Sequence, residues 1–288
     1  MPEAILLEMN EPLDLDATLG CGQAFRWQKR SGWWEGVVGE HALRLRQDGR
    51  LLDVRGADVA FVRHYLALDL DLEAILSSID RDAVIHAAIE ASYGLRILRQ
   101  PLFECLVSYL CATNTNIPAV QRRVQEIAVR FGRRIICDDL PAPSEAYAFP
   151  SPGMLRTATS EAFRTCRLGY RAEYAEAAVM ACDEPCWEDC VRGLSYEEAR
   201  RTLMALSGIG PKAADCIALF GLGHLEAFPV DLWIRRIVGR HYLHGSGQKA
   251  MTPAEYEEIR QFGRSRFGPY AGYAQEYLYC ARTLLCSG

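Results

Sequence analysis

Two glycines, a proline and a lysine follow one another in the stretch Leu206-Ser207-Gly208-Ile209-Gly210-Pro211-Lys212-Ala213-Ala214-Asp215-Cys216. Upstream, Ser195 and Glu198 have the spacing of a capping box, and apolar residues then recur at helical spacing. The two glycines are expected to end that helix, because glycine takes a positive φ at little cost. Pro211 suits the first position of a second helix. We therefore expect a helix, a tight hairpin and a second helix near residues 199–220.

The N-terminus of the second helix offers groups that can bind a ligand and react with it. Backbone N–H groups without partners at that point form a ready site for a phosphate group. Lys212 lies in the first turn, where the positive end of the helix dipole disfavours a charged amine, and partial burial would act in the same direction. A neutral amine is a nucleophile that can form a Schiff base. Further on, Phe228-Pro229-Val230-Asp231 places one acid after an apolar turn.

The hairpin, the lysine and the later aspartate resemble the helix-hairpin-helix DNA glycosylases, whose signature also includes a Gly/Pro-rich segment. Within that superfamily, Gly-Ile-Gly-Pro-Lys-Ala-Ala-Asp-Cys is most similar to the 8-oxoguanine DNA glycosylase/AP lyases. The resemblance implies that Lys212 and Asp231 are catalytic. It also implies that the hairpin, with Gly208 and Gly210, binds the DNA backbone.

Length and composition are those of an ordinary globular protein. The chain has 288 residues, of which 50% are hydrophobic and 24% charged, and its net charge is −5. The negative charge argues against a nonspecific nucleic-acid coat, but a local basic face remains compatible with it, since charges act over roughly 10 Å. Three sets of arginines are candidates for such a face, although each is also explained by a solvated helix surface: Arg122, Arg123, Arg130, Arg133 and Arg134; Arg164, Arg167 and Arg171; Arg235, Arg236 and Arg240.

Neither a secretion signal nor a membrane span is expected. The segment after Met1 lacks the features of a signal peptide, and no window has the ~18 apolar residues of a membrane helix. We therefore expect a cytoplasmic protein, associated with the nucleoid if it is bacterial, with its eleven cysteines reduced. Three of them, Cys182, Cys186 and Cys190, have no obvious fourth ligand, so we expect a structural or surface role and no metal.

The expected fold class is α+β, with an N-terminal domain over residues 1–97 and a mainly helical domain over 98–288. In the first, Ala24 to Trp27 is expected to be a strand, Ala42 to Arg46 alternates in the manner of a second strand, and Asp48-Gly49 suits a hairpin turn. Residues 57–93 then have helical periodicity. The simplest interpretation of this region is an antiparallel sheet with helices packed against it.

Cys21-Gly22-Gln23-Ala24-Phe25-Arg26-Trp27 resembles the Gly-Gln-x-Phe-Arg-Trp segment of the same family. The resemblance implies that the Gly22 carbonyl accepts a hydrogen bond from N7–H of the oxidised base. Normal guanine carries no proton on N7, so an acceptor at that point distinguishes the two bases. Without its neighbours, Gly22 would be explained as an ordinary turn glycine.

Two further motifs of the helical part match the family. In Thr113-Asn114-Thr115-Asn116, the resemblance implies that Asn114 enters the space left by the flipped base, while capping alone would explain either asparagine. In Leu168-Gly169-Tyr170-Arg171-Ala172, it implies that Tyr170 wedges into the base stack and Arg171 contacts the orphaned base. Ala119 occupies a position where eukaryotic members have an arginine that reads the orphaned cytosine. Whether the protein strictly prefers cytosine opposite the lesion is therefore an open question.

The C-terminal part supplies the remaining base contacts that the resemblance implies. Gln275 and Tyr279 are four residues apart and so share a helix face. By resemblance, Gln275 reads the polar edge of the base, Tyr279 stacks on it in place of a phenylalanine, and Cys216 lies on the opposite side. Trp233 departs from the family, where a histidine often contacts a phosphate.

Together these features predict a bifunctional glycosylase/AP lyase that flips 8-oxoguanine out of duplex DNA and needs no metal or organic cofactor. We expect a monomer without an obligate protein partner. The alternatives are a helix-hairpin-helix glycosylase for another oxidised or alkylated base, and a noncatalytic DNA-binding module. The balance of the glycosylase and lyase rates stays open.

Overall fold

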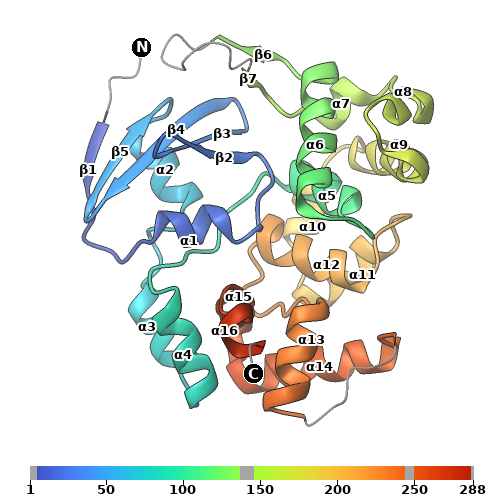
Figure 1. The fold of residues 1–288 in the computed structure, drawn as a ribbon. Coiled ribbons are helices and arrows are strands. Elements are labelled where there is room, and N and C mark those ends of the chain that lie inside the picture. The colour runs from blue at the N-terminus through green and yellow to red at the C-terminus, as the bar shows by residue number, and fades with distance from the viewer. Residues whose placement is uncertain (1–4, 137–145, 244–249, 287–288) are drawn as a thin grey trace.

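A five-stranded antiparallel sheet forms one side of the molecule (Figure 1), in a computed structural model that describes residues 5–136, 146–243 and 250–286. The strand order is β1-β5-β4-β3-β2. The strands are β1 (Ile5–Glu8), β2 (Trp27–Arg30), β3 (Trp33–Val38), β4 (His41–Asp48) and β5 (Leu51–Arg55). The predicted antiparallel sheet is thereby confirmed.

The β4–β5 hairpin follows the predicted alternation. Leu43, Leu45, Leu52 and Val54 are fully buried, and Leu45 lies opposite Val54. The predicted strand from Ala24 to Trp27 is wrong in its start, because regular pairing begins at Trp27, opposite Gly36. The chain just before this strand is held by side chains instead: the Gln23 carbonyl accepts hydrogen bonds from the side chains of Gln100 and Tyr109.

Helices make up most of the rest of the chain, as the helical periodicity predicts. Three follow the sheet: α2 (Val59–Tyr65), α3 (Leu72–Ile79) and α4 (Ala83–Ala91), while α1 (Leu15–Gly20) lies between β1 and β2. The others are α5 (Leu102–Cys111), α6 (Ile117–Phe131), α7 (Pro152–Leu155), α8 (Ser160–Thr165), α9 (Ala172–Cys182), α10 (Trp187–Arg192), α11 (Tyr196–Met204), α12 (Pro211–Ile217), α13 (Leu232–His241), α14 (Pro253–Phe267), α15 (Ala271–Cys280) and α16 (Arg282–Cys286). Short strands β6 (Arg134–Ile135) and β7 (Ala146–Tyr147) pair, and single turns η1 (Gly169–Arg171), η2 (Ala218–Leu222) and η3 (Gly268–Tyr270) complete the order.

Two hydrophobic cores support these layers. The smaller lies between the sheet, α1 and α2, and includes Trp27 and Leu98. The larger is formed by helices from α3 to α15 and also takes in Cys21 and Phe25. α3 and α4 pack on α15, so the end of the N-terminal region shares a core with the C-terminal helices. The domain boundary between residues 97 and 98 stays a prediction.

The predicted succession of helix, tight turn and helix is present in α11 and α12. Ser195 and Glu198 form the capping box of α11, with Ser195 N donating to Glu198 Oε2 over 3.1 Å. Gly208 takes the positive φ that was expected, at 86°. The expectation was wrong for Gly210, which has φ −89° and ψ 179° as the N-cap of α12. An N-cap residue has extended backbone, and Pro211 then takes the first position of the helix.

In the part of the chain described above, every helix is too short or too polar to cross a membrane.

Candidate functional site

A cavity of about 1040 Å³ opens where the α11–α12 turn, the α5–α6 turn, the segment after α1 and α15 meet. It brings together residues that are up to 258 positions apart in the sequence, from Cys21 to Tyr279. Nine of the residues predicted for the site line it: Gly22, Asn114, Gly208, Gly210, Lys212, Cys216, Asp231, Gln275 and Tyr279. Tyr170 and Arg171 are not among its lining residues.

The side chain of Lys212 is exposed within this cavity. Its Nζ lies 5.8 Å from the ring centroid of Tyr109, whose ring stacks on Phe220. Among the described residues, no carboxylate forms an ion pair with Lys212. Its amine is therefore available to a ligand in the cavity.

Asp231 is the N-cap of α13 and has two different carboxylate oxygens. Oδ1 accepts hydrogen bonds from the backbone N–H groups of Trp233 at 2.9 Å and Ile234 at 2.8 Å. These bonds fix the side chain and leave Oδ2 without a hydrogen-bond partner in the described structure. Asp231 can therefore direct one oxygen, with its negative charge, at a group in the cavity while the other holds the helix.

Gly22 occupies a position that only glycine fits. Its φ is +93°, and an added Cβ would lie 2.9 Å from Ile117 Cδ1. The next residue, Gln23, is buried and fixes this turn from both sides. Its Nε2 donates to the carbonyls of Thr18 and Arg96, each at 2.9 Å, and its Oε1 accepts from Leu98 N at 2.8 Å.

α15 contributes a wall of polar side chains. Gln275 and Glu276 are both buried, and one oxygen of each, Gln275 Oε1 and Glu276 Oε2, has no hydrogen-bond partner in the described structure. Tyr279 is half-buried, and burial raises its pKa to about 12. Burial also raises the pKa of the Cys216 thiol to about 12, against the opposing effect of Lys212. Both side chains are therefore neutral surfaces near pH 7.

The α5–α6 turn presents Asn114 at the edge of the cavity. Asn116 is the cap of α6, accepting from Ala119 N at 3.0 Å. Asn114 is exposed in a left-handed conformation, with φ +50°, and its side chain has no partner in the described structure. Such a conformation is more readily adopted by asparagine than by most other residues. Capping thus explains Asn116, and Asn114 is left free for a ligand.

Tyr170 and Arg171 lie beside this turn rather than in the cavity. Tyr170 is 53% exposed, whereas Arg171 is buried, and its guanidinium lies 4.3 Å from the Tyr170 ring centroid. One guanidinium nitrogen of Arg171 donates to the Thr113 carbonyl, next to Asn114. In this structure Arg171 therefore supports the Asn114 turn. Its predicted contact with an orphaned base stays a prediction.

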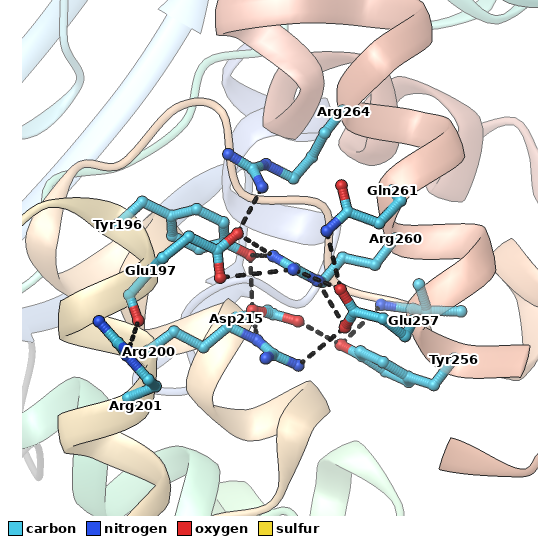
Figure 2. Close-up of polar contacts among 11 residues, drawn as sticks. Tyr196, Glu197, Arg200, Arg201, Asp215, Tyr256, Glu257, Arg260, Gln261 and Arg264 are labelled. Atoms are coloured by element: carbon cyan, nitrogen blue, oxygen red, sulfur yellow. Dashed lines mark hydrogen bonds and ion pairs between the residues drawn. The ribbon is translucent and has the colours of Figure 1, made fainter. Parts of the chain in front are cut away.

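A buried polar network lies behind the lysine-bearing helix (Figure 2). Asp215, fully buried in α12, accepts hydrogen bonds from the Tyr196 and Tyr256 hydroxyls, each at 2.6 Å, and from Arg200 Nε at 2.8 Å. The Tyr256 hydroxyl also accepts from Val230 N at 3.4 Å. Through Tyr256, α12 is joined to the residue that precedes Asp231. Burial raises the pKa of Asp215, and Arg200 acts in the opposite direction.

Three residues described in this subsection are not predicted from the sequence to have a role. Asp215 lies within the hairpin motif, and an acid on a helix face flanked by Ala214 and Cys216 is typical of a buried polar contact. The sequence around Glu276 indicates a buried polar contact in the same way, since Glu276 lies within the otherwise uncharged run from Tyr273 to Tyr279. Gln23 was noted only as part of a motif. Two of its three side-chain hydrogen bonds, those with Arg96 and Leu98, are long-range and have no local sequence signal.

The chain is similar to known proteins over most of its length. Residues 5–106 match the family described as 8-oxoguanine DNA glycosylase, N-terminal domain. The N-glycosylase/DNA lyase OGG1 of Arabidopsis thaliana is 30% identical over 286 residues, which cover 93% of this chain and 77% of the relative. The N-glycosylase/DNA lyase of Saccharomyces cerevisiae is 29% identical, with 93% of this chain and 82% of the yeast protein covered.

A solved structure with the same fold is the Clostridium acetobutylicum 8-oxoguanine glycosylase/lyase in complex with double-stranded DNA containing cytosine opposite 8-oxoG. It has a TM-score of 0.87 and 27% sequence identity, covering 99% of this chain and 97% of that chain.

Proposed function

This chain belongs to the family of 8-oxoguanine N-glycosylase/DNA lyases, and on that premise we propose how its own residues excise 8-oxoguanine from DNA. The observation that carries the proposal is the placement of Lys212 and Asp231 on one cavity together with Gly22, Gln275 and Tyr279. An unpaired amine, a fixed carboxylate and a wall of base-sized contacts are the parts that this reaction needs.

Lys212 is the attacking group in this proposal. The lone pair of Nζ forms a bond to the sugar C1′ while the C1′–N9 bond breaks. The base leaves with the electron pair of the broken bond and takes up a proton. Sugar ring opening gives a Schiff base. Loss of a C2′ proton then expels the 3′ phosphate by β-elimination, and water releases the amine. The base is removed and the strand is cut without a metal or organic cofactor.

Asp231 stabilises the positive charge that develops on the sugar. Its Oδ1 is committed to the N-terminus of α13, so the carboxylate is held in place before the substrate arrives. Preorganised charge of this kind is effective in catalysis because no reorganisation is needed during the reaction. The same carboxylate helps to position or deprotonate Lys212.

The flipped base is read from several sides. The Gly22 carbonyl accepts from N7–H, the unpartnered Oε1 of Gln275 faces the polar edge, and Cys216 and Tyr279 flank the ring. Flipping costs a few kcal/mol. Asn114, exposed at the edge of the cavity, and Tyr170 fill the gap in the stack, while the Gly208–Gly210 turn contacts the backbone phosphates.

Duplexes carrying a single 8-oxoguanine opposite each of the four bases test the proposal, with and without borohydride. The chain has three lysines, Lys29, Lys212 and Lys249, so few amines compete for the trapped adduct. The control variant is K29Q, which removes a lysine of β2 that pairs with Asp16 of α1. Wild-type protein and K29Q should both give lesion-dependent cleavage and a trapped adduct. K212Q should bind the duplex and give neither.

The outcomes separate the alternatives. A trapped adduct in K212Q would refute the role of Lys212. Cleavage of another oxidised or alkylated base with 8-oxoguanine left intact would assign a different lesion, and tight binding without any excision would indicate a binding module. Similar rates opposite all four bases would agree with a relaxed opposite-base preference, which Ala119 predicts.

A further inference from the structure

Two thiols and one carboxylate meet at the wall of the cavity. Cys21 follows α1, while Glu276 and Cys280 lie one helical turn apart on α15. One sulfur or oxygen atom from each of the three lies within 4.8 Å of the other two. Over residues 5–136, 146–243 and 250–286, no other three His, Cys, Asp or Glu side chains approach in this way.

The polar atoms of this cluster are poorly satisfied. Cys21 is 7% exposed and Glu276 is 5% exposed. Glu276 Oε2 is buried without a hydrogen-bond partner, and Cys21 Sγ donates to the Thr18 carbonyl over 3.4 Å. A buried carboxylate oxygen without a partner is costly, so it indicates a ligand that would satisfy it.

The chemistry of the three groups suits a cation. Two thiols and one carboxyl lie within 4.8 Å of one another, and each binds a metal ion in its deprotonated form. A divalent cation can therefore take the place of their protons.

We propose that Cys21, Glu276 and Cys280 form a binding site for a thiophilic divalent cation such as Zn²⁺. Two thiolates and a carboxylate are a suitable donor set for zinc, which binds sulfur at about 2.3 Å and therefore holds two thiolates about 3.8 Å apart in a tetrahedron. Both Cys21 and Glu276 line the cavity, so the fourth position is open to water. Binding exchanges the two thiol protons and the carboxyl proton for the cation.

The position of the site explains what the cation would do. Each ligand is the sequence neighbour of a residue to which we assign base recognition: Cys21 of Gly22, Glu276 of Gln275, and Cys280 of Tyr279. A bound cation would tie the Gly22 segment to α15 and so fix the two sides of the recognition wall relative to one another. It lies beside the reaction and takes no part in bond breaking.

Cobalt titration of the full-length, chelator-treated protein tests this site, because Co²⁺ takes the place of Zn²⁺ and reports thiolate ligation by charge-transfer absorption. We expect one equivalent to bind with tetrahedral ligand-field bands, and Zn²⁺ to displace it. C21S and C280S should lose the thiolate-to-cobalt band. E276Q should retain it with at least about tenfold weaker binding, since even outer-sphere partners of a metal change affinity 10–100-fold.

The matched control is C186S/C190S, which removes two exposed thiols from another part of the chain. It should titrate like the wild type. A cobalt band that is absent from the wild type, or that survives in C21S and C280S but is lost in C186S/C190S, would overturn the proposal. Circular dichroism of each variant establishes that it is folded. The readout does not depend on excision, so a failure of the glycosylase mechanism would leave it interpretable.

Discussion

Replacing Gly208 by alanine should destabilise the protein by about 2–5 kcal/mol, from two separate causes. The first is backbone strain, because φ is +86° at this position and a left-handed conformation costs a residue with a Cβ about 1–2 kcal/mol. The second is steric. The new Cβ would lie 2.5 Å from Cδ2 and 2.6 Å from Cγ of Tyr174 on α9. Overpacking of this kind costs about 1–3 kcal/mol.

Gly210, two residues away, supplies the matched control. Its φ is −89°, and an added Cβ meets no atom within 4 Å. G210A should therefore change stability by less than about 1 kcal/mol, since alanine restricts the unfolded chain but is a poorer N-cap than glycine by a similar free energy. Urea unfolding at constant m-value measures both variants. If phosphates approach the turn as proposed, G210A should bind duplex DNA about tenfold more weakly despite its stability, because one charge-assisted hydrogen bond contributes about 1.5–3 kcal/mol.

A double-mutant cycle separates the two causes in Gly208. With Tyr174 already replaced by alanine, the ring is gone and the backbone strain remains. G208A should then cost about 1–2 kcal/mol in the Y174A background, less than it costs in the wild type. Equal losses in both backgrounds would refute the steric argument. A loss in G208A no larger than that in G210A would refute the whole account of the hairpin.

Three further predictions concern the residues around the cavity. D231N should keep the α13 cap, because asparagine caps as well as aspartate, and should leave stability unchanged while lowering kcat about 10²–10³-fold; an unchanged single-turnover excision rate would remove Asp231 from the mechanism. Y256F should cost about 1–3 kcal/mol in urea unfolding and slow excision, because Asp215 Oδ2 loses a buried donor; wild-type values of both would contradict the role of the network. The third concerns Glu276, whose pKa burial raises above the ordinary 4.5. The native state therefore holds this proton more tightly than the unfolded state, and the stabilisation, complete below 4.5, is lost as the pH rises toward the native pKa. With chelator present, E276Q should gain stability relative to the wild type as the pH rises above 4.5, and parallel pH profiles of the two proteins would contradict a raised pKa.

Local signals in the sequence predicted much of the fold. Strand alternation identified the β4–β5 hairpin because Leu43, Leu45, Leu52 and Val54 all face one core. Caps marked helix starts at Ser195 and Asn116 because a cap depends on residues only three positions apart. Of the nine predicted residues that line the cavity, Gly208, Gly210, Lys212 and Asp231 were indicated by the local pattern, and the other five came from resemblance to a family.

The errors came from long-range contacts. The start of β2 depends on Gln100 and Tyr109, which hold Gln23 from far along the chain. The burial of Arg171 depends on the Thr113 carbonyl, and the φ of Gly210 depends on how the hairpin closes. The exposure of Lys212 could not be predicted from its helix position either, because the cavity that it lines is formed by segments far apart in the sequence.

The buried network explains why Lys212 stands without a carboxylate partner. Asp215 lies three residues further along the same helix, and its two oxygens already accept from Tyr196, Arg200 and Tyr256. The acid of this helix is therefore engaged by side chains of α11 and α14 (Figure 2) and does not pair with the amine. Because Tyr256 also binds Val230 N, the same hydroxyl links the helix that carries Lys212 to the residue before Asp231. A network that satisfies its charges internally can thus join the segments that carry the two proposed catalytic groups without pairing Lys212 with Asp215, which leaves the amine free to react.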